Sequence, residues 1–142
     1  MALRATILVV ASGIVLSGFC LSQQTTVEKM PIRHTSPASA QDMYFAYCAA
    51  CHGKDGKGDG PAASALKVSP PDLTTLAQRN NGVFPRDRVY GTINGQVAIA
   101  AHGSKEMPVW GRLFHSMETD NSLTLLRLKN LTDYIESLQV KK

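Results

Sequence analysis

The chain divides into stretches that differ in their pattern of hydrophobic and polar positions. Residues 5–24 contain no charged side chain, and 5–21 are mostly apolar, which is typical of a leader. Residues 23–40 are rich in Thr, Pro, Ser and Ala without an apolar period, as expected of a flexible linker. Apolar positions at helical spacing begin near residue 41, so one domain of about 100 residues is predicted over 41–142.

The strongest helical stripe lies near the C-terminus, over residues 122–139. Its apolar members recur every three or four positions: Leu128, Leu131, Ile135 and Leu138. Asp120 or Asn121 is expected to cap this helix. The stripe needs an apolar partner, and a short helix that ends before residue 48 is the best candidate. Asp42 is expected to cap that short helix, whose apolar surface comes from four side chains: Met43, Tyr44, Phe45 and Tyr47.

The middle of the chain predicts short elements separated by turns. Four glycines between residues 53 and 60 indicate a loop, and brief helical turns are expected over 61–66 and 72–78. A helix is predicted over 85–93, with proline in its first turn and Gly95 just after its end. No β-rich segment is evident, so the predicted fold class is all-α.

Residues 48–52 read Cys-Ala-Ala-Cys-His, which is the attachment sequence for a c-type haem. Three positions apart on a helical stretch, Cys48 and Cys51 lie on one face and can reach two vinyl groups along one haem edge. His52 can present its imidazole to the iron as the proximal ligand. The motif occurs once, so the sequence predicts one covalent haem c with its iron.

Two other uses of a C-x-x-C pair fit the chain less well. A thioredoxin-like redox site needs a βαβ context, and none surrounds the motif. A zinc site needs two further ligands at suitable spacing. The one remaining cysteine, Cys20, lies in the apolar leader.

The leader, residues 1–22, predicts a periplasmic or otherwise exported location. Arg4 supplies a basic start and an apolar run follows, which is the layout of a secretory signal. Cleavage after Ser22 would release a soluble domain, whereas an uncleaved leader could anchor the chain in a membrane through residues 5–21. A lipid anchor on Cys20 is disfavoured by the bulky Phe19 before it. Soluble and membrane-anchored forms both stay open.

The chain resembles the class I mono-haem cytochrome c family over about residues 41–140. The resemblance rests on the attachment motif, on Met107 and Pro108, and on the final amphipathic helix. It implies a small helical domain wrapped around one haem, with its first and last helices crossing. It also implies Met107 as the sixth iron ligand, and a proline carbonyl, from Pro70 or Pro71, as the partner of the His52 imidazole.

The chemistry of Met107 supports the same assignment. A thioether is a soft, neutral ligand that favours Fe(II). Met107 lies between polar residues and Pro108, in a predicted loop, so it is not part of a core stripe. His102 is the strongest rival because imidazole is also an axial ligand, and His115 and Met117 are weaker ones.

Further residues are candidates for contacts with the haem. Trp110 can pack on the haem edge and donate its N–H to a propionate, with a purely core position as the alternative. Three arginines can either neutralise the propionates or lie exposed on their helices: Arg79, Arg86 and Arg88.

These features predict an electron carrier rather than an enzyme. An enzyme or gas sensor would need an open or displaceable sixth site, which Met107 argues against. The expected partners are a redox donor and acceptor, and the chain can also serve as a subunit of a larger oxidoreductase. Three lysines could steer an acidic partner: Lys54, Lys57 and Lys105. The net charge of +4 is too mild to indicate nucleic-acid binding.

Overall fold

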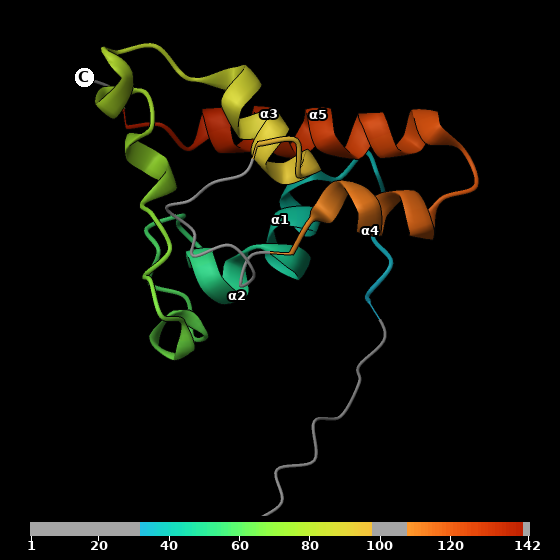
Figure 1. Ribbon diagram of the computed structural model, residues 1–142, viewed down its shortest axis with the longest axis horizontal. Helices are drawn as coiled ribbons and strands as arrows, with labels where there is room; N and C mark the ends of the chain where they lie inside the picture. Colours follow the sequence, from blue (N-terminus) through green and yellow to red (C-terminus); the bar gives the residue numbers. More distant parts are fainter. Residues whose placement is uncertain (1–31, 98–107, 141–142) are drawn as a thin grey trace, which may run out of the picture. The chain divides into compact units, whose positions relative to one another are not determined.

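The computed structural model describes residues 32–97 and 108–140. Along these residues the elements follow in the order α1 Ala40–Tyr47, α2 Ala49–His52, three 3₁₀ turns (Ala63–Ala65, Leu73–Thr75 and Gln78–Asn80), α3 Arg86–Asn94, α4 Trp110–Met117 and α5 Asn121–Ser137 (Figure 1). No strand occurs in the described part of the chain, which confirms the all-α prediction there.

The first helix begins one turn earlier than the sequence suggested. Ser39, not Asp42, is its N-cap, and the Ser39 hydroxyl accepts the backbone N–H of Asp42 at 3.4 Å. The same hydroxyl donates to the Asp42 carboxylate at 2.7 Å. Asp42 therefore supports the cap from the third helical position through the Ser39 hydroxyl, while the Ser39 N–H bonds to the Ser36 carbonyl at 3.1 Å.

The core forms where α5 crosses α1, as predicted (Figure 1). Leu128, Leu131 and Ile135 are buried on α5, and they share one apolar cluster with Met43 and Tyr44 of α1, which are fully buried. The expected cap of α5 is Asp120, whose carboxylate accepts the Ser122 N–H at 2.8 Å. Phe45 was expected to contribute to this surface, but it lies on the other side of α1 and is 43% exposed.

Helix α3 matches its prediction closely, with Pro85 just before it and Gly95 closing it at a φ of 79°. Helix α4 was not predicted. It packs Phe114, fully buried, and Met117 against the core. Gly111 lets α4 approach α3, since a Cβ there would lie 2.8 Å from the Asn94 carbonyl oxygen.

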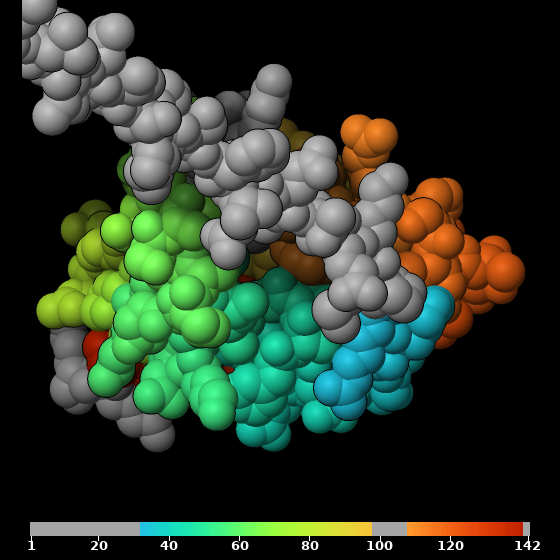
Figure 2. All heavy atoms as spheres, turned by 90° about the horizontal axis from the view of Figure 1, so that it is seen from below, coloured from blue at the N-terminus to red at the C-terminus, as the bar shows by residue number. Residues whose placement is uncertain are grey.

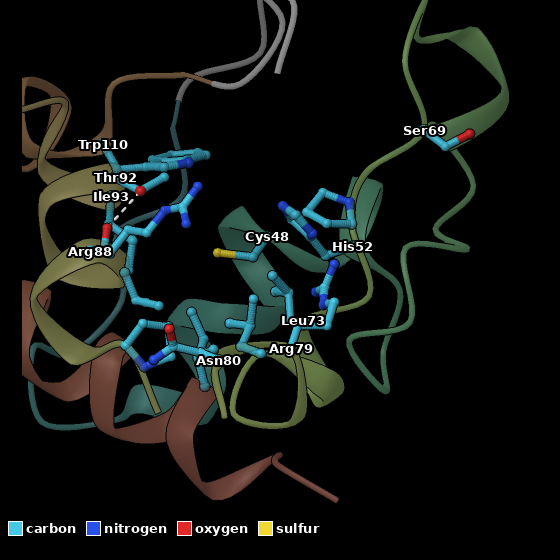
Figure 3. Close-up of a pocket in the computed structure, with 15 residues that line it drawn as sticks. Cys48, His52, Ser69, Leu73, Arg79, Asn80, Arg88, Thr92, Ile93 and Trp110 are labelled. Atoms are coloured by element: carbon cyan, nitrogen blue, oxygen red, sulfur yellow. Dashed lines mark hydrogen bonds between the residues drawn. The ribbon is translucent and has the colours of Figure 1, made fainter. Parts of the chain in front are cut away.

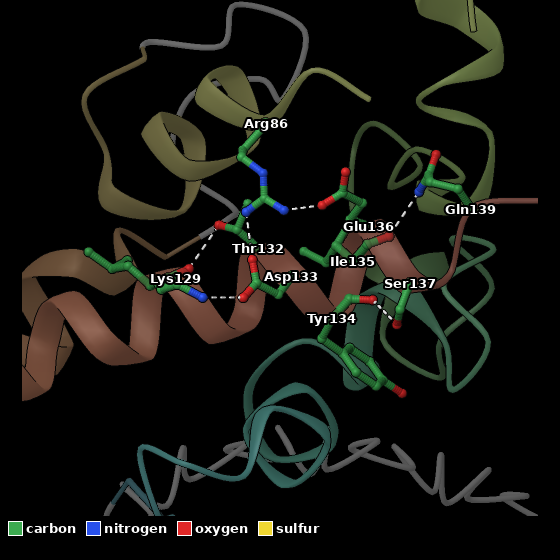
Figure 4. A network of polar contacts seen from close by, with 10 residues as sticks. Arg86, Lys129, Thr132, Asp133, Tyr134, Ile135, Glu136, Ser137 and Gln139 are labelled. Atoms are coloured by element: carbon green, nitrogen blue, oxygen red, sulfur yellow. Dashed lines mark hydrogen bonds and ion pairs between the residues drawn. The ribbon is translucent and has the colours of Figure 1, made fainter. Parts of the chain in front are cut away.

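A network of ion pairs ties α3 to the outer face of α5 (Figure 4). Arg86 pairs with Asp133 at 2.5 Å and also with Glu136. Lys129 reaches the second oxygen of Asp133 at 2.6 Å. The Arg86 side chain is therefore directed to α5.

Residues 32–39, the second part of the predicted linker, lie against the domain. In Figure 2 the blue atoms of this segment lie beside the teal atoms of α1, and the Tyr47 hydroxyl donates to the Arg33 carbonyl at 2.6 Å. The predicted leader, 1–22, and the start of the 23–40 linker lie outside the described residues, so those boundaries stay predictions. Within residues 32–97 and 108–140, no helix has the length and apolar character needed to cross a bilayer.

Candidate functional site

A cavity of about 390 Å³ opens between α2, the 3₁₀ turns, α3 and the start of α4 (Figure 3). Its volume falls in the range of sites that hold cofactor-sized ligands. Most of its wall is apolar, and the lining side chains include Cys48, His52, Pro71, Leu73, Leu76, Val89, Ile93, Trp110 and Ile135. A smaller cavity of about 50 Å³ also borders Cys48, His52 and Trp110 and is closed by Tyr47, Cys51, Val68, Pro70 and Pro108.

The attachment motif spans the junction of α1 and α2. Cys48 ends α1, with its N–H bonded to the Tyr44 carbonyl at 2.8 Å, and α2 continues from Ala49 to His52. The N–H groups of Cys51 and His52 both bond back to the Cys48 carbonyl, at 3.1 and 2.9 Å. The Cys48 sulfur and the His52 ring face the same space (Figure 3). Cys48 and Cys51 are not joined in a disulfide.

The glycine-rich loop 53–60 folds back onto α2 and fixes its backbone. Gly58 donates to the His52 carbonyl at 2.8 Å, and Gly60 donates to the Cys51 carbonyl at 3.1 Å. Gly58 has a φ of 82°, and a Cβ there would lie 2.2 Å from the Pro70 carbonyl oxygen. The sequence predicted a loop here but gave no sign that the loop supports the motif.

The attachment end of the cavity disfavours charge. Burial, with a smaller contribution from Cys51, raises the pKa of the Cys48 thiol to about 12, so that thiol is neutral near pH 7. Burial also raises the pKa of Tyr44 above its ordinary value. The Tyr44 hydroxyl donates to the Gly53 carbonyl at 2.9 Å, directly beside His52. The apolar ring of a macrocycle suits these surroundings better than a hydrated ion.

The three candidate arginines differ in where their side chains lie. Arg79 and Arg88 line the large cavity, whereas Arg86 is held by the α5 carboxylates. Arg79 also donates to the Asp72 carbonyl at 2.5 Å, which fixes its guanidinium near the 3₁₀ turns. Positive charge at the cavity is therefore supplied by α3 and by the turn before it.

Trp110 borders both cavities and also packs against the hydrophobic core. Its ring lines the two cavities, and it packs on Tyr47 and Phe114 with ring centroids 5.1 and 5.8 Å apart. Pro71 borders the larger cavity and Pro70 the smaller one, each together with His52. The roles of these side chains toward a haem stay predictions.

Met107 and its rival His102 lie outside the described residues, as does Lys105. Pro108, next to Met107, borders the smaller cavity. The other rivals are placed elsewhere: Met117 packs on the core and His115 is exposed. Sequence reasoning missed the apolar wall formed by Val89 and Ile93, although their i, i+4 spacing on the predicted 85–93 helix marks one face.

The residues present suit a covalent haem better than a bare metal ion. Cys48 and His52 border an apolar cavity that also carries two guanidinium groups, and Cys51 borders the smaller cavity beside it. Among the described residues, no group of three or more His, Cys, Asp or Glu could hold a metal ion by itself. An iron at this site would therefore depend on a macrocycle for most of its ligands.

The helical fold and this cavity are consistent with a cytochrome c domain. Residues 35–124 match the family of cytochrome c oxidase, cbb3-type, subunit III, and the chain belongs to that family. Its cofactor is a covalent c-type haem with iron, and its function is haem-based electron transfer as a carrier rather than as an enzyme. No curated protein and no solved structure matches the chain.

Proposed function

We propose that the chain carries one electron on a single haem that is bound covalently by Cys48 and Cys51, with His52 as proximal ligand and Met107 as distal ligand. One observation carries this proposal: Cys48 and His52 project into the same apolar cavity, whose smaller neighbour adds Cys51 and Pro108. Met107 directly precedes Pro108 in the chain, and this adjacency supports its assignment as the distal ligand.

When bound, the haem supplies an iron that takes up and releases one electron. The chain contributes binding, orientation and exclusion of water. Apolar lining residues such as Leu73 and Ile93 would exclude water from a bound haem, and the 53–60 loop holds the α2 backbone that carries His52. Arg79 and Arg88 are suited to receive the propionates, because ionised carboxylates bind well to guanidinium groups. Trp110 is suited to pack along one haem edge.

Covalent attachment is tested by extraction of the denatured protein with acid–acetone. The haem should stay with the polypeptide, Cys48→Ala or Cys51→Ala should weaken retention, and His52→Ala should remove the proximal ligand. Haem that moves completely into the solvent from the unmodified protein would overturn the proposed attachment.

The distal ligand is tested with carbon monoxide. A bound thioether must leave before carbon monoxide reaches the iron, so the reduced protein should bind the gas poorly and Met107→Ala should bind it well. Met107→Ala should also lower the reduction potential, because the ligand that favours Fe(II) is lost. Rapid binding by the unmodified protein, together with peroxidase turnover, would instead indicate an open-site enzyme or gas sensor.

The proposal extends to location and partners. We infer that the domain works in the periplasm or an equivalent compartment and exchanges electrons with redox partners in an oxidase complex, as the family suggests. N-terminal sequencing of the purified protein distinguishes a cleaved leader, starting near Gln23, from an intact anchor. The exposed Lys54 and Lys57 are suited to an acidic partner, in which case the electron-transfer rate should fall with added salt.

A further inference from the structure

The segment 33–37, just before α1, makes hydrogen bonds with Tyr47, an aromatic residue that borders the smaller cavity. The Tyr47 hydroxyl donates to the Arg33 carbonyl at 2.6 Å and lies 2.9 Å from the Thr35 hydroxyl. Because the tyrosine proton is used for Arg33, the Thr35 hydroxyl is the donor in the second bond. Asn130 of α5 adds a bond to the Pro37 carbonyl at 2.8 Å.

Arg127 of α5 fixes the same segment from the other side. Its guanidinium donates to the Thr35 hydroxyl at 3.1 Å and to the Thr35 carbonyl at 2.7 Å. The Arg127 side chain is only 3% exposed, and its charge is balanced by Glu118 at 2.5 Å. A buried, paired arginine with several hydrogen bonds holds one geometry, because removing any partner leaves a desolvated charge.

These bonds form a continuous chain with one direction. Arg127 donates to the Thr35 hydroxyl, Thr35 donates to Tyr47, and Tyr47 donates to the Arg33 carbonyl. Each hydroxyl accepts one hydrogen bond and donates one, so its donor and one acceptor position are satisfied together. Loss of either hydroxyl would break the link between α5 and Tyr47.

The Tyr47 ring connects this chain to the cavity. Tyr47 precedes Cys48, borders the smaller cavity together with Pro108, and packs on Trp110 at 5.1 Å and on Phe114 at 5.4 Å. Trp110 begins α4, three positions after Met107. The guanidinium of Arg127 lies 5.8 Å from the centre of the Phe114 ring, so the same arginine also contacts α4.

We propose that three residues act as positioning residues: Tyr47, Thr35 and Arg127. Together they hold the aromatic wall, which is formed by the rings of Tyr47, Trp110 and Phe114, and with it the start of α4. This geometry keeps the proposed distal ligand, Met107, on the iron. The inference rests on the proposed role of Met107. Losing one hydrogen bond from this set would let the wall shift and would increase the population in which the thioether is off the iron.

The test compares carbon monoxide binding by reduced, full-length variants. Tyr47→Phe keeps the ring and removes the hydroxyl, and Thr35→Val breaks the chain at a residue that does not border the cavity. Both variants should bind carbon monoxide about fivefold faster than the unmodified protein, the change expected from the loss of one hydrogen bond. Tyr134→Phe is the matched control. Its ring packs on Tyr44 and borders neither cavity, so its binding rate should be unchanged.

Met107→Ala in the same experiment separates the two proposals. If the unmodified protein binds carbon monoxide as fast as Met107→Ala, the assignment of Met107 is wrong. If the unmodified protein is slow but Tyr47→Phe and Thr35→Val are equally slow, Met107 stands and the positioning role is refuted. Equal acceleration by Tyr134→Phe would also refute it, because the effect would then reflect general loosening of the fold.

Discussion

The contact between Gly60 and α2 gives the sharpest test of how the loop supports the attachment motif. A Cβ on Gly60 would lie 2.4 Å from the Ala50 carbonyl oxygen and 2.6 Å from that of Ala49. Both obstacles are backbone atoms, so neither can rotate away. Gly60→Ala should therefore push the loop off the helix that carries Cys51.

The size of the effect follows from the bonds at the contact. Moving the Cβ to an ordinary van der Waals distance requires a shift of about 1 Å. Such a shift breaks the bond from Gly60 to the Cys51 carbonyl at 3.1 Å and the bond from Ala62 to the Ala50 carbonyl at 2.8 Å. At about 1 kcal/mol for each bond, with a further cost for poorer packing, Gly60→Ala should lose about 2–3 kcal/mol of unfolding free energy.

The assay is guanidinium chloride unfolding of the haem-bound protein, followed by far-ultraviolet circular dichroism. Gly82→Ala is the control, because Gly82 lies in an exposed turn at a φ of 85° and an alanine there carries only the backbone penalty, about 1 kcal/mol. The haem absorption spectrum should also change in Gly60→Ala and not in Gly82→Ala, since only Gly60 touches the motif.

Equal midpoints for the two variants, with equal slopes, would refute the reasoning. That result would mean that the loop yields without losing its bonds to α2. A loss of stability in Gly60→Ala without any spectral change would refute the second step, from the loop to the geometry of the haem ligands.

Three further variants test other parts of the structure. Leu131→Ala, at a fully buried position, should cost about 2–5 kcal/mol of unfolding free energy in the same denaturation assay. Arg88→Ala should lower the reduction potential measured by redox titration, because a positive charge at the cavity favours Fe(II) over Fe(III). Arg86→Ala should lose a small amount of stability near neutral pH, and the loss should vanish in acid. The pKa of Asp133 is held below its usual range by hydrogen bonds from Lys129 and Arg86, so this stabilisation is present above the unfolded-state pKa of about 3.9 and disappears as pH falls through the folded-state value.

Two of these variants have a control within the chain. Phe45→Ala, at a 43% exposed position, should cost far less than Leu131→Ala. Arg86→Ala should leave the potential nearly unchanged, because that guanidinium faces α5; a shift as large as that of Arg88→Ala would contradict the assignment. A stability loss in Arg86→Ala that persists well below pH 3 would mean that the ion pair is not its cause.

The structural features that sequence patterns predicted correctly are those that depend on residues close together in the chain. The stripe on α5, its Asp120 cap and the Gly95 closure of α3 follow local rules, and each was found where it was expected. Helix α4 was missed although Trp110, Phe114 and Met117 recur at spacings of four and three.

Other features depend on contacts between distant parts of the chain, which no local pattern encodes. Which arginine faces the cavity is decided by the carboxylates on α5, some 50 positions away from Arg86. The burial of Arg127 depends on Glu118 and on the backbone of Thr35, 92 positions away in the sequence. The attachment motif could be recognised because covalent chemistry requires a fixed spacing, whereas the walls of the cavity tolerate many combinations of apolar residues.

The crossing of α1 and α5 has a consequence for the order of events during biosynthesis. The apolar side chains that cover Met43 and Tyr44 include Leu128 and Leu131, so the nascent chain cannot complete its core until these residues of α5 have been made. Until then the segment around Cys48, a residue that is partly buried in the finished domain, lacks much of its cover. If the haem is attached to both thiols as proposed, attachment is favoured before α5 docks, and the last helix then closes the domain around a cofactor that is already in place.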